Sequence, residues 1–96
     1  MTQNTHGSFD DLIHPRPRLM VCSALAAVSE MRFDVLAKTV QMNAPALSKH
    51  LAKLTEAGYI SSRPDPKDSR RTWISLTAAG HAAYTGHVKA LQELAK

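Results

Sequence analysis

The chain has 96 residues, of which 44% are hydrophobic and 21% charged, a balance that excludes disordered and low-complexity proteins and suits one compact core. Its single cysteine excludes an intramolecular disulfide framework and a multi-cysteine zinc site. The 12 lysines and arginines outnumber the 8 acidic residues and give a net charge of +4, which favours an anionic partner.

The N-terminal arm, residues 1–11, is polar and is expected to be partly flexible, whereas residues 12–96 should form one domain. Ser8 to Asp11 resembles a capping box that opens a short turn. The apolar residues of this turn are Phe9, Leu12 and Ile13.

The first full helix is predicted to start near Arg16, because Pro15 and Pro17 are tolerated only in or before a first helical turn. Its apolar spacing predicts that it runs to about Ser29. The buried face of this helix is predicted to contain Val21, Leu25 and Val28.

A short helix is predicted over residues 33–40, and residues 41–43 break its pattern. Asn43 can cap a third helix, in which Pro45 lies in the first turn, where its missing N–H costs nothing. This third helix should end at Gly58, because glycine suits the position that follows a helix.

The third helix has two different faces. Leu47, Leu51 and Leu54 recur at helical spacing, which predicts that they belong to the core. The opposite face is small, polar and basic, and it consists of Ala44, Pro45, Ser48, Lys49, Ala52 and Lys53.

Residues 59–63 and 71–76 are predicted to be the two strands of a hairpin with a long basic tip between them. Ile74 and Leu76 should face the core, since alternate residues of a strand point to the same side. Thr77 is expected to cap the last helix.

The last helix, about residues 78–96, carries two apolar lines where one suffices for packing on its own domain. We therefore expect it to be a dimerisation helix, assisted by the apolar residues of the N-terminal turn. The two lines are formed by Tyr84, Val88, Leu91 and Ala95, and by Ala79, Ala83, Ala90 and Leu94.

Two helices joined by a short turn and followed by a basic hairpin are typical of a winged helix-turn-helix, an α+β fold that is mostly helical. Residues 44–77 contain six basic and three acidic side chains, so most of the excess positive charge lies there. A major groove admits an α-helix, and Ser48 and Lys49 can donate hydrogen bonds to base edges. Arg70 and Arg71 at the hairpin tip can reach a minor groove or its flanking phosphates.

Over roughly residues 12–96 the sequence resembles the MarR-type winged-helix transcriptional regulators, in a small, single-domain form. The resemblance rests on LSKHLAKLTEAGYI, on the wing sequence DPKDSRR with Asp68 and Arg70, and on ISLTAAG. It implies a homodimeric regulator of double-stranded DNA, more often a repressor. It also implies that Ser48, Lys49 and His50 read the groove. The complete predicted DNA-binding set is Asn43, Ala44, Pro45, Ser48, Lys49, His50, Lys53, Lys67, Arg70 and Arg71.

Several alternatives stay open beside this interpretation. Trp73 suits packing on the hairpin better than base stacking, and Cys22 suits the core better than redox sensing, because no basic residue follows it in the adjoining turn. The alternative function is a winged-helix module for protein contacts within a larger assembly. Larger members of the family enclose a ligand pocket with additional helices that this chain lacks, so a small-molecule effector remains an open question.

The sequence contains no motif typical of an enzyme, a metal-binding protein or a membrane protein. Glycine-rich phosphate loops, nucleophile elbows and metalloprotease motifs do not occur, so we expect no enzyme activity and no cofactor. The spacing of the five histidines predicts no metal site. Because the sequence has neither an apolar run of about 18 residues nor a signal-peptide pattern, we expect a cytoplasmic protein without a membrane span.

Overall fold

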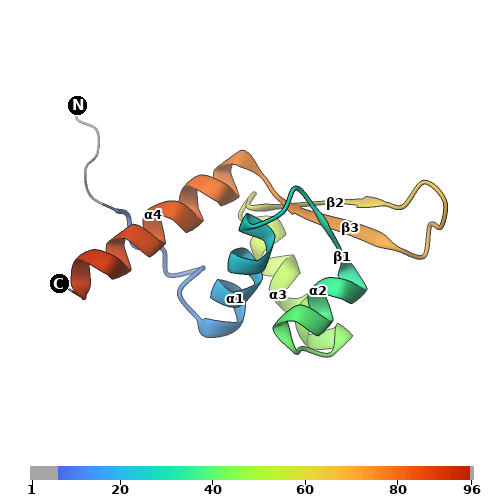
Figure 1. The fold of residues 1–96 in the computed structure, drawn as a ribbon, viewed down its shortest axis with the longest axis horizontal. Coiled ribbons are helices and arrows are strands. Elements are labelled where there is room, and N and C mark those ends of the chain that lie inside the picture. The colour runs from blue at the N-terminus through green and yellow to red at the C-terminus, as the bar shows by residue number, and fades with distance from the viewer. Residues whose placement is uncertain (1–6, 96) are drawn as a thin grey trace.

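The computed structural model describes residues 7–95, and in that range the chain forms four helices and one three-stranded antiparallel sheet (Figure 1). The predicted α+β winged helix-turn-helix is confirmed. The remainder of the predicted N-terminal arm, residues 1–6, lies outside the described residues. In chain order the elements are α1 (Arg16–Ala26), β1 (Met31–Arg32), α2 (Phe33–Val40), α3 (Ala44–Glu56), β2 (Ile60–Pro64), β3 (Thr72–Leu76) and α4 (Ala78–Leu94).

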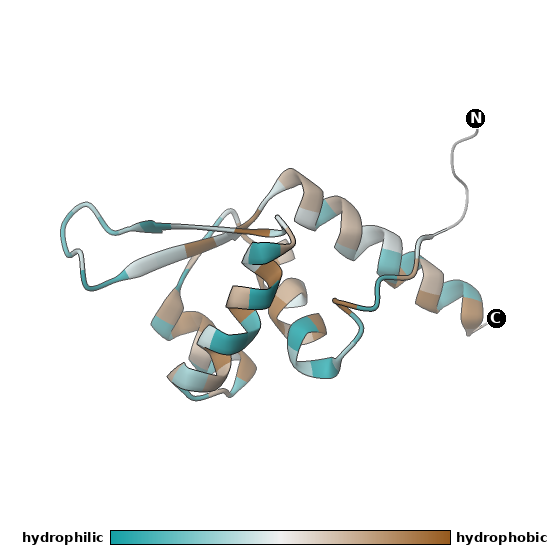
Figure 2. Cartoon of the chain, turned by 180° about the vertical axis from the view of Figure 1, so that it is seen from behind, coloured by the Kyte–Doolittle hydropathy of each residue, from teal (hydrophilic) through white to brown (hydrophobic). Residues whose placement is uncertain are grey.

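The molecule is elongated, with extents of 46 × 26 × 21 Å. The β2–β3 hairpin, which is the wing, extends from one end, and α4 extends from the other (Figure 1). Helices α1, α2 and α3 lie between them. Figure 2 shows that the outer part of the wing is hydrophilic, so the wing projects into solvent as a polar extension of the domain.

One hydrophobic core lies where α1, α2 and α3 meet one face of the sheet. The predicted stripe of Leu47, Leu51 and Leu54 is buried in it, as are the inward-facing Ile74 and Leu76 of β3. All of these predictions are confirmed. The complete buried cluster is Ile13, Val21, Cys22, Leu25, Leu36, Val40, Leu47, Leu51, Leu54, Ile60, Ile74 and Leu76.

The turn between α2 and α3 is built by local side-chain chemistry. Gln41 ends α2 in a left-handed conformation with φ of 57°. The Oδ1 atom of Asn43 accepts a hydrogen bond from the Ala46 N–H at 2.9 Å, and Pro45 lies in the first turn of α3. The predicted cap and start of α3 are confirmed, and together with Gln41 they determine where α2 ends and α3 begins.

Gly58 ends α3 as predicted, with a φ of +83° that favours glycine. The hydroxyl of Thr77 donates to the Gly58 carbonyl at 2.6 Å and accepts a hydrogen bond from the Gly80 N–H at 3.0 Å. Thr77 therefore caps α4, as predicted, and also ties the start of α4 to the end of α3.

Strand β1 has no counterpart among the predicted elements. It contains two residues, Met31 and Arg32, which pair with Ile74 and Trp73 of β3. The sheet order is β1-β3-β2, so β3 is the central strand. Two residues cannot display a strand period, which explains why the pattern misses them.

The predicted end of the first helix is wrong by three residues, because α1 ends at Ala26 and not near Ser29. The chain turns there to bring β1 beside β3. Val28 consequently leaves the helical face that was expected to be buried, and its side chain is 38% exposed.

The N-terminal turn differs from its prediction in two ways. Its capping acceptor is Asp10 and not Ser8, since Oδ1 of Asp10 accepts hydrogen bonds from the Leu12 and Ile13 N–H groups at 2.9 and 3.2 Å. Ile13 is fully buried in the core of its own domain. It therefore has no exposed surface with which to assist a dimer interface, contrary to expectation.

Helix α4 buries Gly80, His87 and Ala90 along one side. A Cβ atom on Gly80 would lie 2.2 Å from the Tyr59 carbonyl oxygen, so this crossing requires glycine. Near the other end of α4 the side chain of Leu94 is 74% exposed. None of the helices described in residues 7–95 is long and apolar enough to cross a membrane.

Candidate nucleic-acid interface

The outer face of α3 is exposed along its length. The core stripe fixes the rotation of the helix, and all six residues of the predicted small, polar and basic face lie on the solvent side. Lys49 and Lys53 are one helical turn apart and line a shallow hollow together with Ala52 and Glu56. The structure thus places the predicted contact residues of α3 on one accessible surface.

The first turn of α3 combines small side chains with a hydrogen-bond donor. Ala44 and Pro45 are exposed there and have no long side chains that would hold another molecule away. Asn43 uses its Oδ1 atom as the helix cap, which leaves the N–H donors of its amide for an outside acceptor. This end of the helix can approach a surface rich in acceptors closely.

His50 differs from the other predicted contact residues because it is half-buried. Its Nδ1 atom lies 3.3 Å from Nη1 of Arg18 on α1, and since guanidinium is only a donor, Nδ1 is the acceptor. Burial and then the positive charge of Arg18, Lys49 and Lys53 lower the pKa of His50. The neutral ring consequently carries its proton on Nε2. This contact could not be predicted from a local pattern, because its partners lie 32 residues apart in the chain.

Asp65 organises the base of the wing tip. Its Oδ1 atom accepts a hydrogen bond from the Lys67 N–H at 2.8 Å, and its Oδ2 atom accepts one from the Trp73 indole N–H at 2.9 Å. Its backbone N–H donates to the Arg71 carbonyl at 2.9 Å. The hydrogen bonds from Lys67 and Trp73 lower the pKa of the Asp65 carboxyl. This carboxylate therefore connects both sides of the tip.

Asp68 organises the basic end of the same tip. It accepts hydrogen bonds from the backbone N–H and from Nε of Arg70, at 3.0 and 3.1 Å, and Nε of Arg71 lies 3.7 Å from its other oxygen. The Arg70 side chain is nevertheless 90% exposed. The pairing orients the guanidinium and leaves most of it accessible to a partner.

Trp73 is a packing residue of the wing, in agreement with its prediction. Its ring is half-buried, with its N–H on Asp65 and the Arg63 guanidinium carbon 5.7 Å from the ring centroid. Arg63 also forms an ion pair with Glu30, which lies just before β1. One face of the indole is therefore occupied by the protein itself, and the base of the wing is tied to the segment between α1 and β1.

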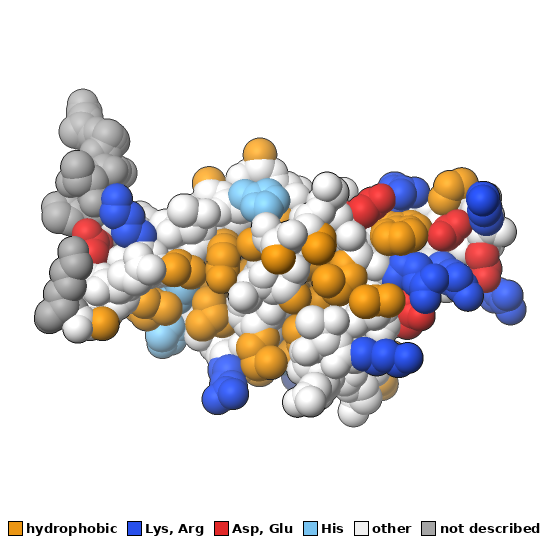
Figure 3. Space-filling model, in the orientation of Figure 1, with side chains coloured by type: hydrophobic (Ala, Val, Ile, Leu, Met, Phe, Trp, Pro, Cys, Tyr) orange, Lys and Arg blue, Asp and Glu red, His pale blue; other side chains and the backbone are white. Residues whose placement is uncertain are grey.

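The predicted contacts fall into two groups in space. The α3 group lies in the body of the domain, whereas Lys67, Arg70 and Arg71 lie on the tip of the wing, which extends beyond the helices (Figure 1). Figure 3 shows lysine and arginine side chains gathered over the wing, with acidic side chains among them. A partner that touches both groups must extend along the molecule.

The remaining candidate groups lie away from this surface. Cys22 is fully buried, and burial raises the pKa of its thiol to about 11, which agrees with a packing role. His87 belongs to α4 and is buried beneath the N-terminal segment. Among residues 7–95, no three histidine, cysteine, aspartate or glutamate side chains converge as metal ligands would.

The family model described as "Winged helix DNA-binding domain" matches residues 18–95 of this chain. A curated relative, the uncharacterized HTH-type transcriptional regulator YdgJ of Bacillus subtilis (strain 168), is 33% identical over 63 residues, which cover 66% of this chain and 38% of the relative. The chain thus spans less than half of the length of that relative.

Solved structures share the fold at low sequence identity. The transcriptional regulator homologue from Pyrococcus horikoshii OT3 has a TM-score of 0.83 at 18% identity, covering 88% of this chain and 84% of its own. MepR of S. aureus, solved as a DNA complex, has a TM-score of 0.78 at 22% identity, covering 88% of this chain and 70% of its own. Because both structures are less than 25% identical to this chain, the likeness shows that they share its fold. The chain belongs to the family of winged helix DNA-binding domains.

Proposed function

We propose that the chain is a cytoplasmic, homodimeric transcriptional regulator that binds double-stranded DNA with α3 in the major groove and the wing at the minor groove. The observation that carries this proposal is the exposed face of α3, where small residues at the leading end precede Ser48 and Lys49. We propose repression as the outcome, because a dimer seated on DNA excludes other proteins from the same site.

The face of α3 suits base reading. Ala44 and Pro45 allow the helix axis to come close to the groove floor, and Ser48 and Lys49 then present donors to base acceptors. Lys53 lies one turn further along, where a phosphate contact is expected. His50 adds a neutral ring whose Nδ1 atom is already used by Arg18, so its Nε2–H is the donor offered to DNA.

The wing suits the DNA backbone or a narrow minor groove. Arg70 is held by Asp68 and remains 90% exposed, so its guanidinium can exchange a carboxylate for a phosphate without a large rearrangement of the tip. Arg71 and Lys67 are exposed beside it. These contacts would fix the position of the domain, while α3 would distinguish sequences.

The dimer is proposed to form through α4. The C-terminal half of α4 extends beyond α1, α2 and α3 (Figure 1), and Leu94 is 74% exposed there. Leu91 and Val88 are half-buried on the same half of the helix. An apolar helix end of this kind gains stability when a second copy covers it.

Selection of bound duplexes from a random library tests the proposal. We expect enrichment of one inverted repeat, with half-sites about one helical turn apart, because a two-fold dimer reads two equivalent half-sites. Recovery of no preferred sequence, together with affinity that does not change with salt concentration, would contradict DNA reading. The alternative, a module for protein contacts, would then take its place.

A further inference from the structure

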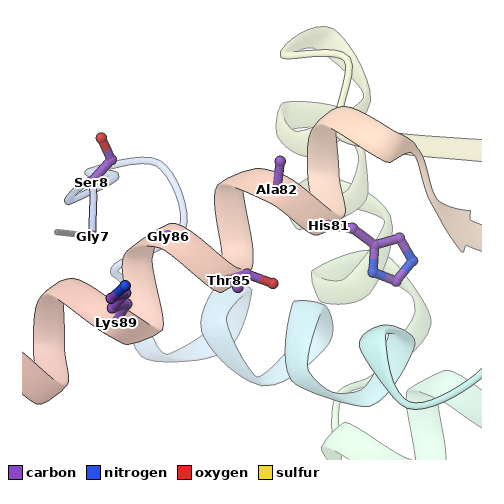
Figure 4. A pocket seen from close by; sticks show the side chains of 7 residues that line it. All are labelled: Gly7, Ser8, His81, Ala82, Thr85, Gly86 and Lys89. Carbon is purple, nitrogen blue, oxygen red and sulfur yellow. The ribbon is translucent and has the colours of Figure 1, made fainter. Parts of the chain in front are cut away.

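Residues 7–14, here named the strap, lie against α4 on a side remote from the wing. Figure 4 shows Gly7 and Ser8 beside Gly86, in a groove that continues along α4 past Thr85 and Lys89. The Ser8 N–H donates to the Gly86 carbonyl at 3.0 Å, and the Gly7 N–H donates to Glu93 at 3.0 Å. A Cβ atom on Gly7 would lie 2.2 Å from the Ala90 nitrogen, so the contact has no room for a side chain.

His87 lies beneath the strap and is fully buried. Its Nδ1 atom accepts a hydrogen bond from the Asp10 N–H at 2.9 Å. Its Nε2 atom lies 3.3 Å from Nδ1 of His14, and the Phe9 ring packs edge-on against the imidazole with centroids 4.7 Å apart. Both ring nitrogens of this buried histidine are therefore used by the strap.

The direction of these hydrogen bonds fixes the protonation state of the pair. A backbone N–H can only donate, so Nδ1 of His87 must be unprotonated, and the proton of the neutral ring lies on Nε2. That Nε2–H donates to Nδ1 of His14, which must be unprotonated as well. The closed strap thus accepts one arrangement of protons, in which both rings are neutral and His87 Nε2 has no lone pair for a metal ion.

We propose that the strap is a proton-sensitive clasp, closed on α4 while His87 is neutral and released when His87 is protonated. Imidazolium donates from both nitrogens. Protonated His87 would therefore direct an N–H at the N–H of Asp10. This event removes the buried acceptor on which the closed strap depends.

The groups around His87 shift its pKa in opposite directions. Burial and then the neighbouring His14 lower the pKa of His87, while Asp10 and Asp11 oppose this shift. The carboxylate of Asp10 is itself occupied, since Oδ2 accepts the Tyr59 hydroxyl at 2.7 Å and Oδ1 caps the N-terminal turn. The Asp10 carboxylate therefore does not act as the direct acceptor for a proton on His87.

The sign of the pH dependence follows from this arrangement. A base whose pKa is lower in the closed state stabilises that state above the ordinary histidine pKa of about 6.5, and this contribution is lost as the pH falls toward the closed-state pKa. Between the ordinary pKa and the closed-state pKa, each pH unit by which the pH falls raises the ratio of open to closed strap by up to about tenfold for each proton taken up. The core leucines of α3, which lie outside the strap, should keep their protection.

Amide hydrogen exchange of the 96-residue chain, followed by NMR at about pH 7.5 and about pH 5.5, tests the proposal. After correction for intrinsic exchange rates, we expect protection of the Ser8 and Asp10 amides to fall by about tenfold or more at the lower pH. Protection of the Leu54 amide should stay constant. Imidazole nitrogen spectra at the higher pH should show the His87 proton on Nε2. Protection of the strap that is equal at both pH values, or a proton on Nδ1, would overturn the proposal.

Substitutions test whether the pair of His14 and His87, and not another titratable group, causes the pH dependence of strap protection. Glutamine offers one acceptor and one donor but does not titrate, so the double variant His14→Gln with His87→Gln should lose the pH dependence of strap protection. His81→Gln, an exposed histidine on the same helix, is the matched control and should retain it. A double variant with the pH dependence of the wild type would overturn the assignment. If the double variant fails to fold, the wild-type titration and tautomer decide the question alone.

Discussion

The indole N–H of Trp73 donates to Oδ2 of Asp65 at 2.9 Å, while the other oxygen of the same carboxylate accepts the Lys67 N–H at 2.8 Å. One side chain thus joins strand β3 to the loop that forms the wing tip. An aspartate can do this because both of its oxygens are acceptors, whereas an asparagine has a single acceptor oxygen.

We therefore expect Asp65→Asn to loosen the wing tip. Hydrogen exchange should become faster for at least one of two protons, the Lys67 amide and the Trp73 indole N–H, because one of the two donors loses its acceptor. NMR measures both rates. Asp11→Asn, at an exposed carboxylate of the strap, is the matched control and should leave the wing unchanged. Wild-type exchange at both positions in Asp65→Asn would show that the carboxylate does not organise the tip.

Acid should loosen the tip in the same way. The hydrogen bonds from Lys67 and Trp73 lower the pKa of Asp65. A carboxyl group with a lowered pKa contributes order that is fully present above its unfolded pKa of about 3.9 and is lost as the pH falls through the folded value. Protection of the wing should therefore be constant from neutral pH to about pH 4 and should fall below it. A loss of protection already near neutral pH would contradict this account.

The proposed dimer depends on the exposed end of α4. Leu94→Asp should weaken self-association without disturbing the fold, since this side chain is 74% exposed. Leu91→Asp should dissociate the dimer too, although Leu91 is half-buried and its loss also affects the domain. Light scattering at concentrations of tens of micromolar measures the effect. Ala79→Asp, exposed at the opposite end of α4, is the control. A monomeric wild type under these conditions would contradict the proposal.

Cys22 should be inert toward mild oxidants. Its thiol is fully buried and its pKa is raised to about 11, so almost no thiolate is present at neutral pH. Peroxide should therefore leave DNA affinity unchanged in the wild type and in Cys22→Ala. Cys22→Ser should lower the free energy of unfolding by roughly 1–3 kcal/mol, because it buries a hydroxyl in an apolar core. Release of the wild type from DNA by peroxide, but not of Cys22→Ala, would show a redox role instead.

Features with local causes could be predicted from the sequence. Asn43, Pro45 and Gly58 each determine a helix boundary through their own backbone chemistry, and the spacing of Leu47, Leu51 and Leu54 fixes which face of α3 is exposed. The exposed residues of the candidate interface follow directly from these boundaries. This is why most of the α3 surface could be located without a structure.

Features that depend on distant partners could not be predicted. The contact of Arg18 with His50 and that of Asp10 with His87 join residues 32 and 77 positions apart, and neither has a repeating pattern. Strand β1 exists because β3 has a free edge beside it, and its two residues have no periodicity. The end of α1 was predicted too late for the same reason, since the apolar Val28 continues the helical spacing after the chain has turned toward β1.

The two groups of predicted DNA contacts should respond differently to mutation. Lys49 lies near the start of α3, where base edges are within reach, whereas Arg70 lies on the exposed wing tip. Loss of a base contact should cost on the order of 1–3 kcal/mol and should weaken the preference for one sequence. Loss of a phosphate contact should weaken binding to all sequences and should reduce the slope of log affinity against log salt by about 0.9 per contact.

Lys49→Ala should therefore lower the ratio of specific to random affinity, and Arg70→Ala should mainly flatten the salt dependence while keeping that ratio near the wild-type value. Each substitution counts twice in a dimer. Titrations on the selected duplex and on a scrambled one, at about 50 and 200 mM salt, measure both quantities. Lys89→Ala, which removes an exposed positive charge from α4, controls for net charge alone. If Lys49→Ala and Arg70→Ala both bind the two duplexes like the wild type, α3 and the wing do not contact DNA in the proposed way. Each variant lacks the side chain that is proposed to make the contact at its surface, so an unchanged affinity means that the contact does not exist.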